Sequence, residues 1–298
     1  MLPELEKNVE HSATIFFRLA PSSSSPPTST KWFHHWYLPD GQISLSVGKN
    51  GSVYSLRFPG LALFQITPAQ SKITCYHFDI PADTIRHLLL DQVIPRLLSQ
   101  QGKQILHASC VKVGKFAVAF SGNSGWGKST LSAFFHNQGY PLLTDDCLQL
   151  HMTKGNVMSI PNYQGIRLLP DTLPLFHKSV NSDTTPKSSP KKRFKTPSTQ
   201  IQGRTIPIKN IFILKDPASI PQNTQTTITK IIGAKAPIEL IKNCFPLDIT
   251  DKKIIGRQLI DLSRIANSEN ISIHSLIFPR KINFLPEVMI NILKHTST

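Results

Sequence analysis

The residues best suited to chemistry in this sequence form a glycine-rich run, Gly122-Asn123-Ser124-Gly125-Trp126-Gly127-Lys128-Ser129. Its pattern, Gly-x-x-x-x-Gly-Lys-Ser, is that of a loop whose backbone N–H groups cradle nucleotide phosphates. Lys128 would reach the β- and γ-phosphates, and the Ser129 hydroxyl would be a ligand to Mg²⁺. The run and the following Thr130 are therefore the predicted binding site for ATP and Mg²⁺.

A pair of adjacent carboxylates, Asp145 and Asp146, follows a short hydrophobic run at residues 141–144. That run is typical of a strand, and ligands of parallel α/β sheets bind at the carboxyl ends of strands. Both carboxylates are therefore expected to face the loop, one holding Mg²⁺ and the other accepting a proton from an incoming hydroxyl. A solvated turn or a helix-capping pair is the alternative interpretation.

The loop lies between elements that suit a phosphate site. Residues 116–120 are continuously apolar, as expected for a strand buried on both faces. After the loop, Leu131, Phe134 and Phe135 share one face of a predicted helix that ends at Gly139. A glycine-rich turn that matches by chance is the alternative, and this order of strand, loop and helix disfavours it.

The remaining hydrophobic pattern predicts an α/β or α+β protein in two parts. Residues 1–100 form a predicted β-rich region with a helix at 82–100, interrupted near Pro95. Residues 101–298 form the predicted phosphate-binding domain. Its further predicted elements are strands at 104–111, 147–150 and 206–214, helices at 254–265 and 286–293, and a long, mobile, basic loop at 178–203.

Three runs in this order resemble one known family. They are His107-Ala108-Ser109-Cys110-Val111, residues 119–131 around the glycine loop, and Gly139-Tyr140-Pro141-Leu142-Leu143-Thr144-Asp145-Asp146. Together they resemble the C-terminal domain of HPr serine kinase/phosphorylase and the broader HPr-kinase-like group, which includes kinases that modify lasso-peptide precursors. Residues 166–171 and 278–282 also resemble elements of that group.

The resemblance implies a mixed sheet flanked by helices, and it implies roles for individual residues. Asp145 would be the general base that takes the proton from a substrate serine, and Asp146 and His107 would support that carboxylate or the metal. By chemistry alone, a single histidine on a strand is more often a core residue, and the resemblance makes the core and functional interpretations of His107 about equal. The family has an acidic metal ligand where residues 161–165 offer only amides, and its N-terminal domain does not match residues 1–100.

Arg167 and the basic residues at 187–195 are further candidates. An arginine near a transferring phosphate stabilises developing charge, and a lysine-rich loop could close over nucleotide or grip an acidic peptide. A solvated surface segment is the alternative for the basic residues. An aromatic cluster at 32–37 is expected to pack under a sheet rather than bind a cofactor.

Composition limits the classes of function. The 298 residues carry 33 Lys and Arg against 18 Asp and Glu, a net charge of +15, and 40% are hydrophobic, enough for a real core. Hydrophobic stretches are too short for a membrane span and the start lacks a signal pattern, so we expect a cytoplasmic protein with no membrane partner. The four dispersed cysteines, Cys75, Cys110, Cys147 and Cys244, are expected to be buried fillers.

These observations predict a Mg·ATP-dependent kinase that phosphorylates a hydroxyl, serine above all, on a peptide or small-protein partner. The alternative is an ATPase or a nucleotide-dependent regulatory protein that uses the same loop without phosphotransfer. A nucleic-acid-binding module is disfavoured because aromatic residues do not interleave with the basic cluster. The oligomeric state is left open, a homo-oligomer included.

Overall fold

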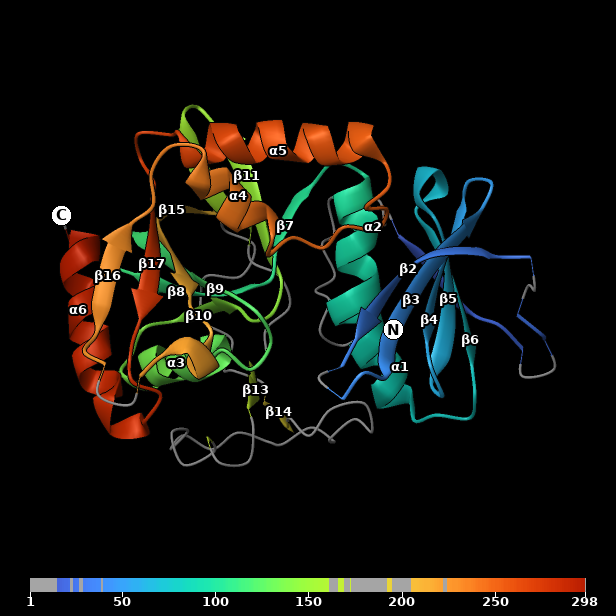
Figure 1. Ribbon diagram of the computed structural model, residues 1–298, viewed down its shortest axis with the longest axis horizontal. Helices are drawn as coiled ribbons and strands as arrows, with labels where there is room; N and C mark the ends of the chain where they lie inside the picture. Colours follow the sequence, from blue (N-terminus) through green and yellow to red (C-terminus); the bar gives the residue numbers. More distant parts are fainter. Residues whose placement is uncertain are drawn as a thin grey trace.

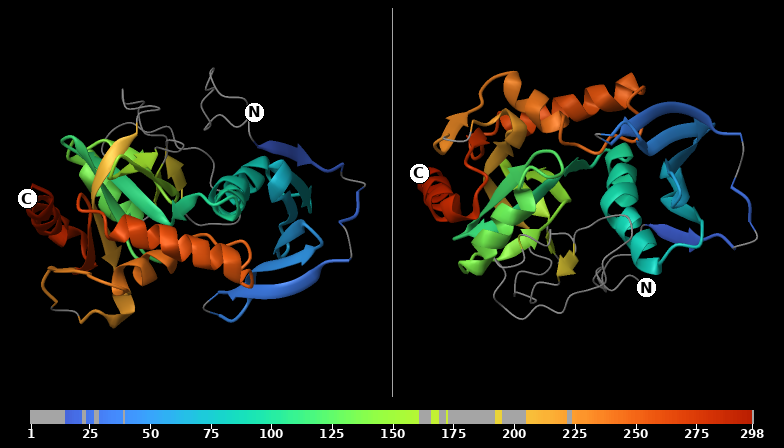
Figure 2. Two further views of the ribbon diagram at one scale, coloured as in Figure 1. Left: turned by 90° about the horizontal axis from the view of Figure 1, so that it is seen from above. Right: turned by 60° about the horizontal axis from the view of Figure 1, so that its bottom comes forward.

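The structure is a computed structural model that describes residues 15–21, 24–26, 29–38, 40–160, 166–168, 172, 192–194, 205–221 and 224–297. Its two larger sheets lie at opposite ends of the molecule, with helices α1 (Ala82–Leu88) and α2 (Ile94–Gln100) between them (Figure 1). A long helix, α5 (Lys252–Ala266), runs from the second sheet toward the first, as the further views also show (Figure 2). Helix α5 reaches α2, where the side-chain amide of Gln258 donates a hydrogen bond to the Ser99 hydroxyl.

The N-terminal sheet has six strands in the described part of the chain, in the order β1-β6-β5-β4-β3-β2. Neighbours are antiparallel, except that β1 runs parallel to β6. Alternate apolar residues of the strands fill one face and pack against Ile85, Leu89 and Leu97 of the helices. The strand bounds are β1 Phe16–Leu19, β2 Lys31–Tyr37, β3 Ile43–Asn50, β4 Val53–Phe58, β5 Ala62–Thr67 and β6 Lys72–His77.

The predicted helix at 82–100 is interrupted, as expected, although the break begins before Pro95. Helix α1 spans Ala82–Leu88, a π-helical turn, η2, spans Leu89–Val93, and α2 spans Ile94–Gln100. The N–H of Ile94 donates to the carbonyl of Leu89, five residues earlier. Because Pro95 has no N–H and its ring crowds the carbonyl four residues before it, the wider turn accommodates the proline.

The second sheet is mixed, and its main path runs β10-β8-β9-β15-β12-β11-β7, with β17 joining β15 to β16. Strands β9, β15 and β17 are parallel, and the other pairs are antiparallel. The bounds are β7 Gln104–Leu106, β8 Ala108–Val113, β9 Phe116–Ser121, β10 Leu142–Thr144, β11 Leu148–Thr153, β12 Asn156–Ile160, β15 Ile206–Leu214, β16 Thr227–Lys230 and β17 Ser272–Ile277.

Helices cover both faces of this sheet. Val118 and Phe120 of β9 point toward α3 (Lys128–Asn137) and α6 (Leu285–Ser297), while Ala117 and Ala119 point toward α4 (Lys235–Ile241) and α5 (Lys252–Ala266). The alternation leaves β9 buried on both sides, as its continuous apolar run predicted. The predicted fold class, an α/β protein with a β-rich N-terminal region and a mixed sheet flanked by helices, is confirmed.

Two predictions about strands and loops need correction. The expected strand at 104–111 is divided at His107, because β7 pairs with β11 whereas β8 pairs with β9 and β10. The loop expected at 178–203 contains a strand, β14 (Lys192–Phe194), that pairs with β13 (Ile166–Leu168). The rest of that loop lies outside the described residues.

The cysteine and membrane expectations can also be compared with the structure. All four cysteines are free thiols; Cys75, Cys110 and Cys147 are buried, and Cys244 is only partly buried. Within the described ranges, no helix combines the length and the apolar character needed to cross a membrane. The aromatic cluster at 32–37 forms the edge strand β2, where Phe33 and Trp36 pack partly against the first core.

A buried carboxylate joins the N-terminal sheet to the segment before α5. The Oδ2 atom of Asp248 accepts from Lys49 Nζ at 2.7 Å and from the Tyr54 hydroxyl at 3.2 Å, and Oδ1 accepts from the Thr250 hydroxyl and N–H. Burial alone would raise the pKa of Asp248, but the hydrogen bonds from Lys49 and Thr250 outweigh it and keep the pKa below its ordinary 3.8. The ionised carboxylate is therefore the form that stabilises the fold.

Replacing Asp248 by Asn tests this junction because the variant keeps the shape and removes the charge. We expect D248N to lower the free energy of unfolding by about 1.5–3 kcal/mol at neutral pH, the usual contribution of a hydrogen bond to a charged group. The contribution is fully present above the unfolded pKa and is lost as the pH falls through the lower folded value. Urea unfolding should therefore show that the difference in unfolding free energy between the parent and D248N shrinks at acid pH. A difference that does not change with pH would contradict the assignment.

Candidate functional site

The glycine loop occupies the turn between β9 and α3. Gly125 and Gly127 adopt φ angles of +83° and +91°, a region that residues with a side chain rarely adopt. Gly127 is also crowded, because a Cβ there would lie 3.0 Å from Nη1 of Arg280. Glycine is thus needed at Gly127 both for the backbone conformation and for the approach of the arginine.

The side chain of Lys128 lies against its own loop. Its Nζ donates to the carbonyl oxygens of Gly122 at 2.8 Å and Asn123 at 3.0 Å, and the residue is only 4% exposed. The backbone of Lys128 is held as well, since its carbonyl accepts from the Ser109 hydroxyl at 3.0 Å. The loop therefore presents a positive charge at the N-terminus of α3, where the helix dipole also favours anions.

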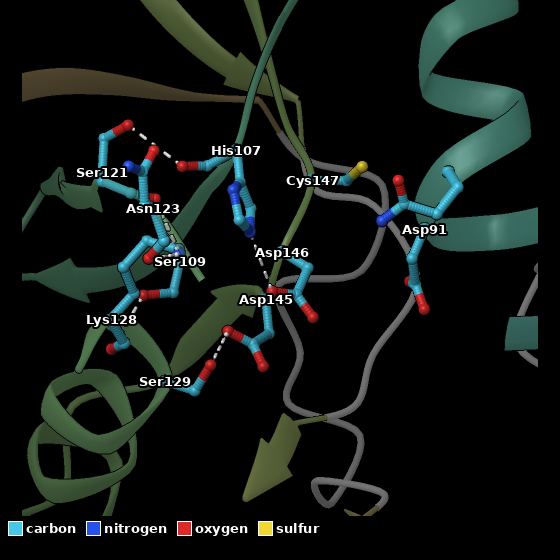
Figure 3. Close-up of polar contacts among 12 residues, drawn as sticks. Asp91, His107, Ser109, Ser121, Asn123, Lys128, Ser129, Asp145, Asp146 and Cys147 are labelled. Carbon is cyan, nitrogen blue, oxygen red and sulfur yellow. Dashed lines mark hydrogen bonds and ion pairs between the residues drawn. The ribbon is translucent and has the colours of Figure 1, made fainter. Parts of the chain in front are cut away.

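The helix that follows the loop contacts the first of the two carboxylates. Ser129 Oγ donates to Asp145 Oδ1 at 3.0 Å, and Asp145 is 2% exposed (Figure 3). Because Asp145 directly follows β10, this hydrogen bond connects the start of α3 with the end of a neighbouring strand. A hydroxyl and a carboxylate at this separation are oxygen donors of the kind Mg²⁺ prefers.

Strand direction brings His107 to the same edge. Strand β8 runs antiparallel to both β9 and β10, so its first residues lie beside the last residues of those two strands. The Nε2 atom of His107 lies 3.4 Å from Asp146 Oδ1, and Figure 3 shows the imidazole directed at that carboxylate. The structure thus groups His107, Lys128, Ser129, Asp145 and Asp146 at one sheet edge.

Asp146 has an unusual backbone conformation for a residue with a side chain. Its φ of +64° lies in the left-handed region, which aspartate and asparagine tolerate better than most residues. Residue 146 is also only 9% exposed, and the chain turns there into β11. The turn directs the second carboxylate toward His107, and unusual backbone geometry of this kind is commonly found at functional sites.

The other predicted residues lie around this group or outside the described side chains. Trp126 is half-buried, and its ring lies close to Gly122, whereas Ser124 and Gly125 form the outer part of the loop and Thr130 lies in the first turn of α3. Arg167 lies in β13, paired in register with Arg193, and its side chain is outside the described part. The basic residues at 187–195 are described only at 192–194, by their backbone.

Arg280 was not predicted as a site residue, yet it supports the glycine loop. Its Nη1 donates to the Trp126 carbonyl and its Nη2 donates to the Lys215 carbonyl at 2.7 Å, while the guanidinium lies over Phe278 at 3.9 Å from the ring centre. Burial lowers the pKa of Arg280 to about 10, so it stays charged at neutral pH. The run Phe278-Pro279-Arg280 after a hydrophobic strand was visible in the sequence, but its contact with the loop was not.

Within the described ranges, no group of three or more His, Cys, Asp and Glu side chains has the arrangement of a protein-only metal site. The oxygen donors at the loop are Ser129, Asp145 and Asp146. A hydroxyl and two carboxylates fit Mg²⁺, which commonly takes one or two carboxylates and completes its shell with substrate phosphates and water. The donor set therefore suits a metal that arrives with a nucleotide.

No protein-family model matches the sequence, and no curated protein matches it. Among solved structures, the chain is similar to the HPr(Ser) kinase/phosphatase from Coxiella burnetii, with 15% sequence identity and a TM-score of 0.36. The similarity covers 65% of this chain and 96% of that chain. A TM-score of this size carries no argument about the chemistry, which rests on the contacts described above.

Two alanine substitutions separate backbone strain from crowding at the loop. Gly125→Ala and Gly127→Ala both force a side chain into the left-handed region, at a cost on the order of 1–3 kcal/mol. Only the Cβ of Gly127→Ala meets other groups within 4 Å, Nη1 of Arg280 at 3.0 Å and the Phe278 ring at 3.9 Å, and only the contact with Arg280 is crowded. We expect Gly127→Ala to reduce the unfolding free energy more than Gly125→Ala in urea titrations; equal losses would show that the arginine does not constrain the loop.

Proposed function

We propose that this chain is a Mg²⁺-dependent kinase of the HPr-kinase type that transfers the γ-phosphoryl group of ATP to a hydroxyl, above all that of a serine, on a peptide or small protein. The observation that carries the proposal is the 3.0 Å hydrogen bond between Ser129 and Asp145. It joins a residue of the phosphate-binding motif to a carboxylate, so phosphate binding and proton acceptance are adjacent. His107 and Asp146 at the same edge add to this support.

The loop would bind the phosphates of ATP. Its N–H groups and the N-terminus of α3 favour phosphate oxygens, and Lys128 would exchange the carbonyls of Gly122 and Asn123 for the β- and γ-phosphates. Mg²⁺, when bound with the nucleotide, neutralises charge on the phosphate oxygens. Ser129 and Asp146 are the proposed residues that hold it, and Asp145 lies next to them.

Asp145 would accept the proton of the acceptor hydroxyl as the γ-phosphoryl group is transferred in line. Its burial and its hydrogen bond from Ser129 restrict the carboxylate to one orientation, as a general base requires. The contact with Ser129 also allows the opposite assignment of roles. Asp145 would then hold the metal, and Asp146, oriented by His107, would accept the proton. The two assignments predict different responses to magnesium.

A paired substitution distinguishes them. We expect Asp145→Asn to reduce transfer from γ-labelled ATP by about 10²- to 10⁴-fold, the usual share of a general base, with ATP affinity nearly unchanged. The matched variant is Asp146→Asn, which keeps the left-handed backbone accessible. If Asp146 holds the metal, this variant should raise the Mg²⁺ concentration needed for half-maximal transfer, and Asp145→Asn should not. The reverse pattern would exchange the two roles.

The acceptor is measured in the same experiment. The purified chain, labelled ATP and Mg²⁺ are incubated with a serine-containing peptide library and with cell extract, and free phosphate is separated from labelled peptide or protein. A labelled acceptor that depends on Asp145 supports the kinase. Free phosphate without a labelled product would overturn phosphotransfer and favour the ATPase or the nucleotide-dependent regulatory protein.

Removal of the loop cation tests nucleotide binding separately. We expect Lys128→Met to weaken ATP binding by at least about tenfold, because one charge-assisted contact to phosphate is worth roughly 1.5–3 kcal/mol. Titration calorimetry measures the affinity, and the fluorescence of Trp126 within the loop gives an independent signal. Affinity unchanged from the parent protein would contradict the assignment of this loop as the phosphate site.

A further inference from the structure

A small hydrophobic cluster lies beneath the candidate site. It contains Ile105, Cys147 and Phe245, with Leu98 of α2 packed against it. Ile105 lies two residues before His107, and Cys147 directly follows Asp146. The cluster therefore lies under both chain segments that bring the histidine and the second carboxylate together.

The segment that carries Phe245 contacts His107 in two ways. The carbonyl of Asn243 accepts from the His107 N–H at 2.7 Å, and the Phe245 ring lies 5.7 Å from the imidazole, centre to centre. Phe245 is 6% exposed. The backbone bond places the histidine, and the phenyl ring limits the rotation of its side chain.

Arg96, a buried cation of helix α2, contacts the Phe245 ring from the side of the N-terminal region. The guanidinium of Arg96 lies 5.6 Å from the Phe245 ring centre and 5.3 Å from that of Trp36 in β2. Its Nη1 also donates to the carbonyl of Gln92 at 2.8 Å and to its Oε1 at 2.9 Å. Arg96 thus connects the N-terminal sheet, the π-helical turn and the ring that contacts His107.

The burial of Arg96 is costly, so packing alone does not account for it. The residue is 6% exposed, and its Nε has no hydrogen-bond partner among the described residues. Burial lowers the pKa of Arg96 to about 10, which still leaves the group charged at neutral pH. A methionine would fill a similar space without desolvating a charge, whereas the guanidinium contributes a planar, charged surface that orients aromatic rings.

We infer that Arg96 is a positioning residue of the candidate site, which fixes the Phe245 ring and through it the imidazole of His107 that faces Asp146. The N-terminal region thereby supports the candidate site through the contact of Arg96 with Phe245. The catalytic part of this inference rests on the proposed function, and the geometric part does not. Both parts are tested with the same set of variants.

The variants are Arg96→Met, which removes the positive charge, and Arg96→Lys, which keeps the charge but replaces the planar guanidinium by an ammonium group. Lys49→Met is the matched control, because it breaks a contact between the same two regions at Asp248, without contact to Phe245 or His107. Phe245→Leu keeps Arg96 and removes the phenyl ring that lies beside the His107 imidazole. All four are compared with the parent at one pH and below their unfolding temperatures.

The first readout is the imidazole Cε1–H resonance of His107 in NMR spectra, assigned by its loss in His107→Gln. We expect it to shift in Arg96→Met and in Phe245→Leu, since the ring current of Phe245 acts on it, and to stay in place in Lys49→Met. The second readout is phosphotransfer: kcat should fall about tenfold or more in Arg96→Met, the scale of a small misplacement, with KM for ATP within about twofold. Arg96→Lys should recover part of the loss.

The outcomes are separable. A His107 resonance that stays in place in Arg96→Met overturns the inference, as does an equal loss of kcat in Arg96→Met and Lys49→Met, which would indicate general loosening. A parent protein without phosphotransfer would overturn the proposed function alone, and the NMR comparison would still decide the role of Arg96. If Arg96→Met does not fold, Arg96→Lys decides it: a His107 resonance at an altered position supports the inference, and a resonance at the parent position overturns it.

Discussion

Strand direction in the second sheet is the constraint on which the candidate site depends. Because β8 runs opposite to β9 and β10, the beginning of one strand and the ends of two others share an edge. That edge collects a histidine, a glycine loop and two carboxylates that are far apart in the chain. The hydrogen bond from Ser129 to Asp145 then ties the helix after the loop to the strand that carries the carboxylates.

Much of this arrangement could be predicted from the sequence. The apolar run before the glycine loop, the helix after it and the strand at 206–214 all have local signals, and each was located correctly. His107 is different: its strand changes partner there, because β7 pairs with β11 and β8 with β9. A hydrophobic pattern reports which residues are buried but not which strand lies alongside, so the break was not visible.

The contacts of the two buried arginines were equally inaccessible to sequence reasoning. Arg280 reaches the loop from a segment after β17, and Arg96 reaches Phe245 from a helix of the N-terminal region. Each depends on long-range packing, for which spacing along the chain carries no signal. The same holds for the contacts of Asp248 and Arg96, two buried charged groups through which the N-terminal region contacts the segment between α4 and α5.

The support that Arg280 gives to the loop has a consequence for the order of events during synthesis. The carbonyl of Trp126 and the guanidinium that binds it are 154 residues apart. A chain emerging from the ribosome therefore exposes the complete phosphate-binding motif long before its supporting arginine is available. The nascent chain therefore passes through a stage in which the loop lacks its contact with Arg280, and that contact forms only late in translation.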